Sequence, residues 1–214
     1  MDAQQVARIL DALEQLYPQA RPELNFSNPY ETLIATILSA QCTDRRVNQV
    51  TRELFARYPD AEHMAKLTPE ELEPIIKPCG LYHHKAKNIV ETSRALVERF
   101  DGKVPQSREE LMSLPGVGQK TAGVVLLAAF GDDQIPVDTH VFRVSNRIGL
   151  AHALTAAQTE EQLRNTLPRD SWSHAHHLII WHGRRVCHAR KPACESCPLR
   201  TELCEYATTS QTED

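Results

Sequence analysis

A helix-capping pattern occurs three times in this chain and indicates its fold class. In each copy, Asn, Thr or Ser is followed three residues later by Glu, which is the signature of a helix N-terminus. The copies occupy residues 28–31, 68–71 and 107–110, and the first two carry Pro at the first helical position. Apolar residues then recur every three or four positions, as at Leu33 and Ile37. No run of four or more residues alternates convincingly like a strand, so the sequence predicts an all-α fold of short helices.

The length of 214 residues suffices for one large domain or two small ones. The longest apolar run, residues 122–130, contains Gly123 and is too short to cross a bilayer. The first residues show no basic segment followed by an apolar one. We therefore expect no membrane span and no signal peptide, and a protein that acts in the cytoplasm, at the nucleoid if it is bacterial.

The charge balance alone does not indicate nucleic-acid binding. The net charge is −4, from 24 basic and 28 acidic residues, whereas nucleic-acid-binding domains are more often strongly basic. The charges are unevenly distributed, because residues 75–90, 111–131 and 182–193 contain Lys or Arg but no Asp or Glu. If these stretches share one face, that face is basic on a mildly acidic protein.

Four of the six cysteines form a local cluster, Cys187-x6-Cys194-x2-Cys197-x6-Cys204. Inside a cell thiols stay reduced, so such a cluster indicates a metal site rather than disulfides. Four thiolates suit either a tetrahedral zinc ion or a [4Fe–4S] cube. Zinc sites usually pair two Cys-x2-Cys knuckles, and this cluster has only one. The spacing favours an iron–sulfur cluster over zinc. Zinc, or no metal at all, stays open as an alternative.

A Pro-Gly turn separates two helical patterns within residues 111–122, as in a helix–hairpin–helix motif. Gly116 and Gly118 can adopt positive φ and carry no Cβ, so a phosphate can approach the backbone N–H groups that begin the second helix. This arrangement binds a nucleic-acid backbone without reading bases. The alternative is a tight helix–helix turn in which the glycines serve geometry alone.

The motif LPGVGQKTA at residues 114–122 is followed by VDTHV at residues 137–141 and then by the cysteine cluster. Together these motifs resemble endonuclease III, a family of bifunctional DNA glycosylase/lyases for oxidised pyrimidines. Further matching segments extend the resemblance over nearly the whole chain, at residues 28–34, 38–41, 80–82, 85–86 and 182–184. The resemblance implies a base excision repair enzyme that acts on damaged duplex DNA and cleaves 3′ to the abasic site by β-elimination. A monomer is the default expectation.

Two residues carry the chemistry that the resemblance implies. Lys120 lies in the first turn of the second hairpin helix, where a neutral amine can attack the sugar of an extruded nucleotide and form a Schiff base. Asp138 precedes an apolar helical pattern as its N-cap, and the resemblance gives it a role in stabilising charge on the sugar or accepting a proton. The alternatives from residue chemistry are an exposed phosphate-binding lysine at Lys120 and a capping role alone at Asp138.

The resemblance also implies DNA contacts and metal ligands. The expected DNA contacts are Gln41, Leu81, Gly116, Gly118, Arg184 and Lys191. Leu81 would wedge into the base stack, with ordinary packing as the alternative; for Gln41 the alternative is mere exposure. A [4Fe–4S] cluster is expected on Cys187, Cys194, Cys197 and Cys204. Six residues separate Cys197 from Cys204, where the family has five. It therefore stays open whether Cys204 is the fourth ligand. A structural role for the cluster is expected, and a redox role stays open.

Other functions of the same fold are weighed against this one. An adenine-mismatch glycosylase lacks the lysine and has Glu where this chain has Thr36, and a thymine-mismatch glycosylase usually lacks the lysine too. A non-catalytic helix–hairpin–helix module would bind DNA or transfer electrons without base removal.

The domain organisation is expected to be two helical lobes with a DNA cleft between them. A helix–hairpin–helix six-helix domain is predicted over residues 21–132. A discontinuous iron–sulfur domain is predicted over residues 1–20 and 133–214. The tail after Tyr206 is predicted to be unstructured.

Overall fold

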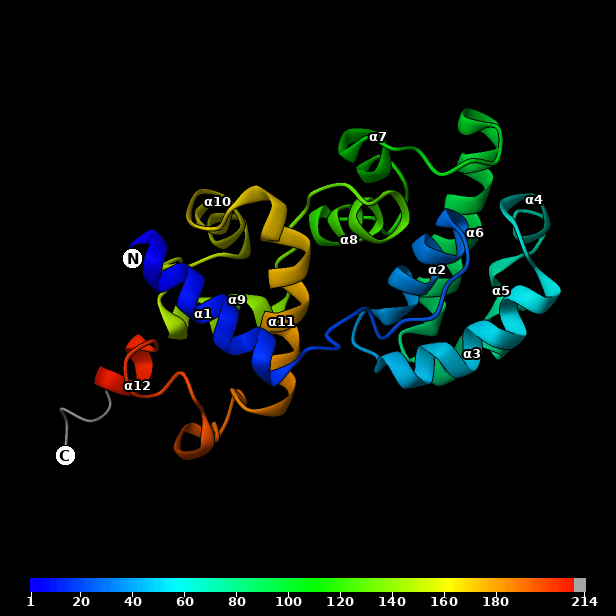
Figure 1. Ribbon diagram of the computed structural model, residues 1–214. Coiled ribbons are helices and arrows are strands. Elements are labelled where there is room, and N and C mark those ends of the chain that lie inside the picture. Colours follow the sequence, from blue (N-terminus) through cyan, green and yellow to red (C-terminus); the bar gives the residue numbers. More distant parts are fainter. Residues whose placement is uncertain (210–214) are drawn as a thin grey trace. The chain divides into compact units, whose positions relative to one another are not determined.

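The computed structural model describes residues 1–209, and within them every regular element is helical (Figure 1). The α-helices are α1 (Ala3–Leu16), α2 (Pro29–Ser39), α3 (Asp44–Arg57), α4 (Ala61–Met64), α5 (Pro69–Ile76), α6 (Tyr82–Phe100), α7 (Arg108–Met112), α8 (Gln119–Phe130), α9 (Thr139–Ile148), α10 (Ala156–Thr166), α11 (Trp172–Arg185) and α12 (Glu205–Thr209). Three short 3-10 helices are η1 (Lys77–Cys79), η2 (Arg169–Ser171) and η3 (Cys194–Ser196). The all-α prediction is confirmed.

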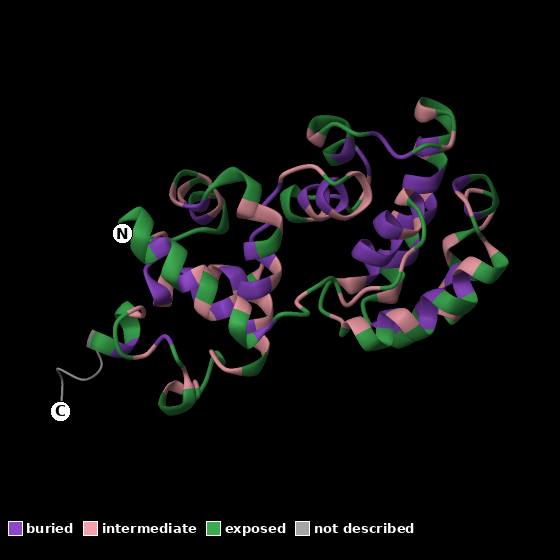
Figure 2. Ribbon diagram, viewed as in Figure 1, coloured by how far each residue is buried: buried purple, intermediate pink, exposed green. Residues whose placement is uncertain are grey.

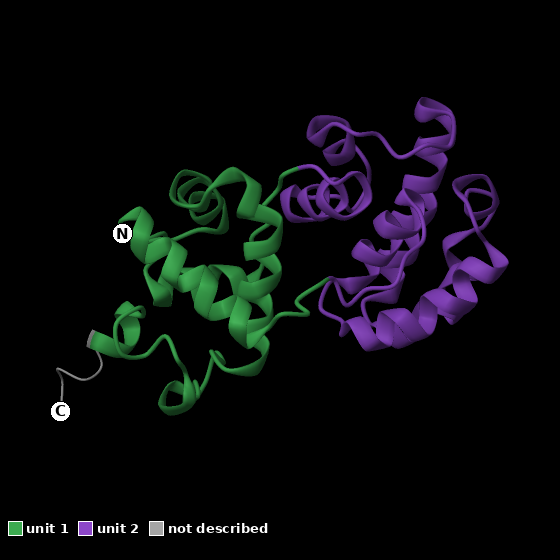
Figure 3. Ribbon diagram, viewed as in Figure 1, with its two compact units in different colours: residues 1–21, 133–214 green, residues 22–132 purple. Residues whose placement is uncertain are grey.

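The chain divides into two compact units (Figure 3). One unit joins Met1–Arg21 to Asp133–Asp214, and the other is the continuous segment Pro22–Asp132. Each unit has its own apolar core, as the buried positions in Figure 2 show.

The central helix of Pro22–Asp132 is α2, which is buried at eight of its eleven positions. It packs against α8, α3 and α6, and α6 in turn packs against α4 and α5. Leu33, Ile34 and Leu38 of α2 are fully buried in this core. A helix that is apolar on most sides needs neighbours on most sides, and this requirement gathers the other helices around α2.

The predicted capping patterns begin three of these helices. Asn28 accepts from the backbone N–H of Glu31 at 2.9 Å, and Ser107 accepts from that of Glu110 at 3.2 Å. Thr68 forms the full reciprocal box with Glu71. At α2 the Glu31 carboxylate accepts instead from the backbone N–H of Ser27 at 2.7 Å. The local signals therefore place these helix starts correctly.

The other unit is built on α9 and α11, with α1, α10 and α12 packed around them. Fully buried residues of its core include Ile9 and Leu13 from α1, Val144 from α9 and Ile179 from α11. The prediction of an unstructured tail is wrong for its first residues, because α12 extends to Thr209; residues 210–214 lie outside the described range. No helix within residues 1–209 has the length and apolar character needed to cross a membrane.

Candidate functional site

The predicted hairpin is formed by α7, the turn at residues 113–118, and α8. Gly116 has φ +74°, and a Cβ built there would lie 2.6 Å from the side-chain nitrogen of Asn88. The Thr92 hydroxyl donates to the carbonyl of Pro115 at 2.7 Å, so α6 holds the turn from behind. Both the backbone conformation and the close approach of Asn88 require glycine at position 116.

Gly118 serves the hairpin in a different way. Its φ is −96°, a region open to any residue, so its conformation does not explain the glycine. It is the N-cap of α8, no side chain caps that helix end, and a Cβ added to it would have no atom within 4 Å. The missing side chain therefore leaves open space at the N-terminus of α8, as an anion site requires.

Lys120 and Asp138 both lie near helix N-termini, in different units. Lys120 is exposed in the first turn of α8, two residues after Gly118. Asp138 is the N-cap of α9, and its Oδ1 accepts from the backbone N–H groups of His140 and Val141, both at 2.8 Å. The predicted capping role of Asp138 is confirmed. Asp138 as a whole is half-buried.

His140 follows Asp138 in the first turn of α9 and was not singled out by the sequence reasoning. Burial lowers its pKa below the usual value; Asp138 opposes this shift, and Arg143 reinforces it. The His140 Nδ1 lies 3.2 Å from a guanidinium nitrogen of Arg143, whose hydrogens make it the donor. His140 is part of the VDTHV motif, but the N-cap pattern in that motif indicates a role only for Asp138.

Gln41 and Leu81, both predicted to contact DNA, lie in short exposed loops of Pro22–Asp132. Gln41 has φ 53° and Leu81 has φ 49°, so both hold the left-handed conformation that non-glycine residues avoid. Such a residue costs about 1–2 kcal/mol of folding free energy. Leu81 is 53% exposed, which makes packing in the core an insufficient account of this apolar side chain. Strain of this kind at two exposed positions is typical of functional loops.

The four clustered cysteines all line one pocket of their unit, together with Arg147 and His182. Arg147 donates to the Cys187 sulfur at 3.5 Å, and His182 Nε2 lies 3.7 Å from the Cys197 sulfur. Burial raises the pKa of both the Cys197 and Cys204 thiols, and the neighbouring thiols raise it further. Cys204 thus shares the pocket despite its longer spacing.

The four thiols supply the donor type that either an iron–sulfur cube or a single zinc ion takes. Among residues 1–209, no three or more His, Cys, Asp or Glu side chains converge closely enough to hold one metal ion. In a [4Fe–4S] cube each thiolate binds a different iron atom, so the four sulfurs lie farther apart than around one zinc ion. Four thiols around one pocket give the number and type of donors that a cube requires.

The loop after α11 carries Lys191 and is fixed by two arginines of α9. Arg143 donates to the carbonyls of Gly183 and Cys187 at 3.0 Å. Arg147 donates to the carbonyls of His188 at 2.7 Å and Ala189 at 3.1 Å. Lys191 is exposed with φ 50°. These arginines were missed because nothing in the α9 sequence distinguishes a loop anchor from a surface cation.

Arg184, predicted at DNA, is half-buried in the last turn of α11, and the neighbouring Gly183 lies against α9. A Cβ at Gly183 would lie 3.0 Å from both His140 and Val144. The glycine before Arg184 therefore lets α11 approach α9 closely.

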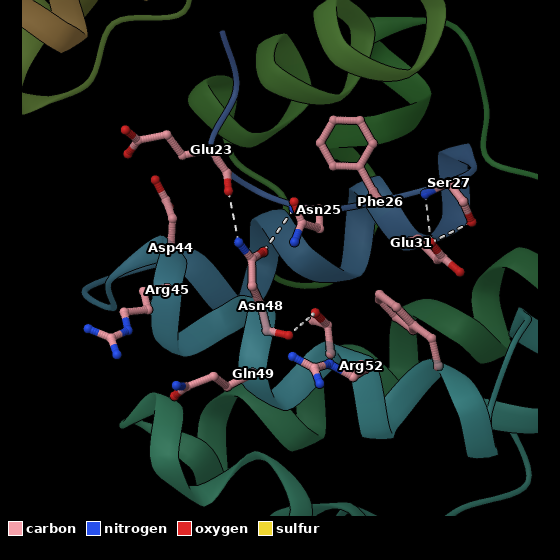
Figure 4. A pocket seen from close by; sticks show the side chains of 12 residues that line it. Glu23, Asn25, Phe26, Ser27, Glu31, Asp44, Arg45, Asn48, Gln49 and Arg52 are labelled. Carbon is pink, nitrogen blue, oxygen red and sulfur yellow. Dashed lines mark hydrogen bonds between the residues drawn. The ribbon is translucent and has the colours of Figure 1, made fainter.

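A separate hollow of about 780 Å³ lies between α3 and the segment that precedes α2 (Figure 4). Asn48 accepts from the backbone N–H of Asn25 at 2.8 Å and donates to the Glu23 carbonyl at 2.8 Å. These bonds fasten the segment to α3. None of the site residues predicted from the sequence lines this hollow.

Comparisons with known proteins agree with this geometry. Residues 34–169 match the family described as "HhH-GPD superfamily base excision DNA repair protein". "Endonuclease III" of Synechocystis sp. is 49% identical over 208 residues, which cover 97% of this chain and 94% of that protein. "Endonuclease III" of Escherichia coli is 47% identical over 198 residues, which cover 92% and 93%. The solved "Structure of a Trapped Endonuclease III-DNA Covalent Intermediate: Estranged-Adenine Complex" matches with a TM-score of 0.93 and 43% identity, over 99% of both chains.

Proposed function

Because this chain belongs to the endonuclease III family of HhH-GPD base excision DNA repair proteins, it is a DNA glycosylase and AP lyase, and we propose that Lys120 is its nucleophile. We propose oxidised pyrimidines in damaged duplex DNA as its substrates. The observation that carries the assignment of Lys120 is its position: an exposed amine lies in the first turn of a helix whose N-terminus has no side-chain cap. A phosphate bound at that end would hold the sugar of an extruded nucleotide beside the amine.

The proposed reaction begins with the neutral amine of Lys120. Its nitrogen bonds to C1′ while the bond from C1′ to the damaged base breaks, and the base leaves with the bonding electrons and takes up a proton. Opening of the sugar ring gives a Schiff base between Lys120 and C1′. The Schiff base acidifies the C2′ proton, and loss of that proton expels the 3′ phosphate by β-elimination. Hydrolysis of the resulting imine frees Lys120.

Asp138 is proposed to act on charge rather than as a nucleophile. Its carboxylate would stabilise positive charge that develops on the sugar, or accept a proton from the lysine amine. Two backbone N–H groups hold its Oδ1 at 2.8 Å, so capping and catalysis are compatible in one side chain. A carboxylate fixed by a helix end is pre-organised for such a role.

DNA is the partner of this enzyme, and we propose which residues bind it. Gly116 and Gly118 would present backbone N–H groups to a phosphate, while Arg184 and Lys191 would neutralise phosphates from the other unit. Gln41 and Leu81 would enter the duplex at the extruded nucleotide, with Leu81 as the apolar wedge. Action as a monomer and a cytoplasmic or nucleoid location complete the proposal.

We propose that Cys187, Cys194, Cys197 and Cys204 bind a [4Fe–4S] cluster. When bound, the cluster would supply a covalent cross-link across the C-terminal segment and a one-electron redox couple. Arg147 and His182 contact two of the four sulfurs and would orient these ligands. Binding of the cluster to Cys187 and Cys194 would close the loop between them and hold Lys191 toward phosphate.

A cleavage assay on a duplex with one thymine glycol tests the function. We expect the wild-type chain to cut the strand without alkaline treatment, and Lys120→Ala to abolish cutting while duplex binding is kept. Lys103→Ala is the matched control, since Lys103 is an exposed lysine of the same unit outside the hairpin. Strand breaks that appear only after alkaline treatment would instead indicate a monofunctional glycosylase. Binding without loss of the base would indicate a non-catalytic module.

A further inference from the structure

Lys85 is a buried lysine in the first turn of α6, with 4% of the residue exposed. Its ammonium donates to the main-chain carbonyls of Leu38 and Cys79, both at 2.9 Å. Burial of an ammonium is unfavourable unless hydrogen bonds replace the lost water. Burial accordingly lowers the pKa of Lys85 below its usual value. A neutral side chain would fill this core position at a lower cost in desolvation free energy. The two hydrogen bonds are what lysine provides here and an apolar side chain would not.

The two carbonyls belong to the ends of two helical segments. Leu38 lies in the last turn of α2, and Cys79 is the last residue of η1. The final carbonyls of a helix lack partners within it, and a cation is favourable at that end. The thiols of Cys42 and Cys79 lie close enough to the ammonium to raise its pKa, against the larger effect of burial. Lys85 thus joins the end of α2 to the end of η1.

Each of these ends leads directly into a strained, exposed loop residue. Gln41 follows Leu38 by three residues, and Leu81 follows Cys79 by two. Both are in the left-handed conformation, which an L-residue keeps only where its surroundings fix it. One ammonium therefore anchors the segments that carry both of the residues expected to enter the duplex.

We propose that Lys85 is a positioning residue that holds Gln41 and Leu81 at a fixed separation, so that both enter the duplex together as the nucleotide is extruded. This inference rests on the proposed role of those two residues at DNA. Loops that are already ordered lose less conformational entropy when they bind. Lys85 would therefore favour extrusion of the nucleotide without touching the substrate. On a substrate that needs no extrusion, the reaction at Lys120 would not depend on Lys85.

The experiment compares Lys85→Met with the wild type on two substrates. One is a duplex with a single thymine glycol and fluorescent 2-aminopurine as the neighbouring base; the other is a single-stranded abasic oligonucleotide, which needs no extrusion. Extrusion of the damaged nucleotide unstacks 2-aminopurine and raises its fluorescence. In Lys85→Met we expect most of this rise to be lost and the single-turnover rate on the duplex to fall about tenfold. The rate on the single strand should stay within about twofold of the wild-type rate. Lys103→Met, which removes an exposed lysine of the same unit, should change neither rate.

A second set of variants tests whether Lys85 acts through the two loops. In a Gln41→Ala/Leu81→Ala background, Lys85→Met should slow the duplex reaction by less than about twofold, because residues that act as a unit are not additive. A full tenfold loss in that background, or equal losses on duplex and single strand, would overturn the proposal. If Lys85→Met melts below the assay temperature, Lys85→Gln, which keeps a donor for one carbonyl, replaces it under the same criteria. A wild-type chain that cleaves neither substrate would contradict the proposed function instead.

Discussion

The imidazole of His182 lies with Nε2 3.7 Å from the sulfur of Cys197. Its other nitrogen, Nδ1, is 3.0 Å from the hydroxyl of Tyr17, which ends α1. If the tyrosine donates to Nδ1, Nε2 carries the proton and donates to the cysteine sulfur. A three-residue chain of hydrogen bonds then connects the N-terminal helix to the proposed cluster site, and both His182 and Tyr17 are buried.

His182→Phe is expected to weaken retention of the cluster. The substitution removes the bond to Cys197 and leaves the buried Tyr17 hydroxyl without its partner, at a cost of about 1–3 kcal/mol in the free energy of unfolding. Iron content and visible absorbance, followed during exposure to air, should fall faster than in the wild type. Tyr17→Phe, which spares the bond to sulfur, should have a smaller effect on iron. Equal iron retention in all three proteins would contradict this account.

The two hairpin glycines should respond differently to alanine. Gly116→Ala should lower the free energy of unfolding by about 1–3 kcal/mol, because φ is +74° and the new Cβ meets Asn88. Gly118→Ala should cost less stability, at most about 1 kcal/mol as expected for Ala at an N-cap, but should weaken DNA binding about threefold to tenfold, because its Cβ would take up space beside the N–H groups that begin α8. Urea denaturation and fluorescence anisotropy of a labelled duplex measure the two quantities. A Gly118→Ala chain that binds DNA normally would exclude a phosphate at this helix end.

Substitutions of Asp138 separate its cap from its charge. Asp138→Asn keeps a good N-cap, so the free energy of unfolding should change by less than about 0.5 kcal/mol, whereas Asp138→Ala should cost about 1 kcal/mol. Both should slow single-turnover base removal by a similar factor, about a hundredfold, because both remove the carboxylate charge. If Asp138→Asn retained the wild-type rate, capping would be the whole role of this residue.

His177 makes the stability of the fold depend on pH. Burial lowers its pKa to about 4, with a further contribution from His174. The unfolded chain, with an ordinary value near 6.5, therefore binds a proton that the folded chain does not bind. This stability is full at pH 7 and is lost as the pH falls from about 6.5 to about 4, with a loss of roughly 1–2 kcal/mol at pH 5. Urea denaturation of the wild type and His177→Asn should show a smaller decrease between pH 7 and pH 5 in the variant; an identical decrease would contradict the assignment.

The features predicted from the sequence are those set by local chemistry. Asn28, Thr68 and Ser107 begin their helices as expected, and Asp138 caps α9, because each cap depends on a few adjacent residues. The hairpin was recognisable for the same reason. Its second glycine was explained less well, since Gly118 has an ordinary φ and contributes only by lacking a side chain.

The features that escaped prediction depend on segments far apart in the sequence. Gln41 and Leu81 hold left-handed conformations that their residue types do not predict. The sequence does contain a sign of the burial of Lys85, because Lys85 lies four residues before buried Ile89 on the apolar side of its helix. A lysine at a core position of a helical pattern indicates a buried ammonium with specific partners. Its partners, the carbonyls of Leu38 and Cys79, could be known only from the fold.

Borohydride trapping followed by peptide mapping tests the central claim, that Lys120 forms the covalent intermediate. Borohydride reduces an imine between enzyme and DNA to a stable amine, so digestion and mass spectrometry identify the lysine that carries the sugar. We expect one modified peptide, with the adduct on Lys120, and no trapped complex from Lys120→Ala. An adduct on any other lysine, or undiminished trapping in the variant, would contradict the account.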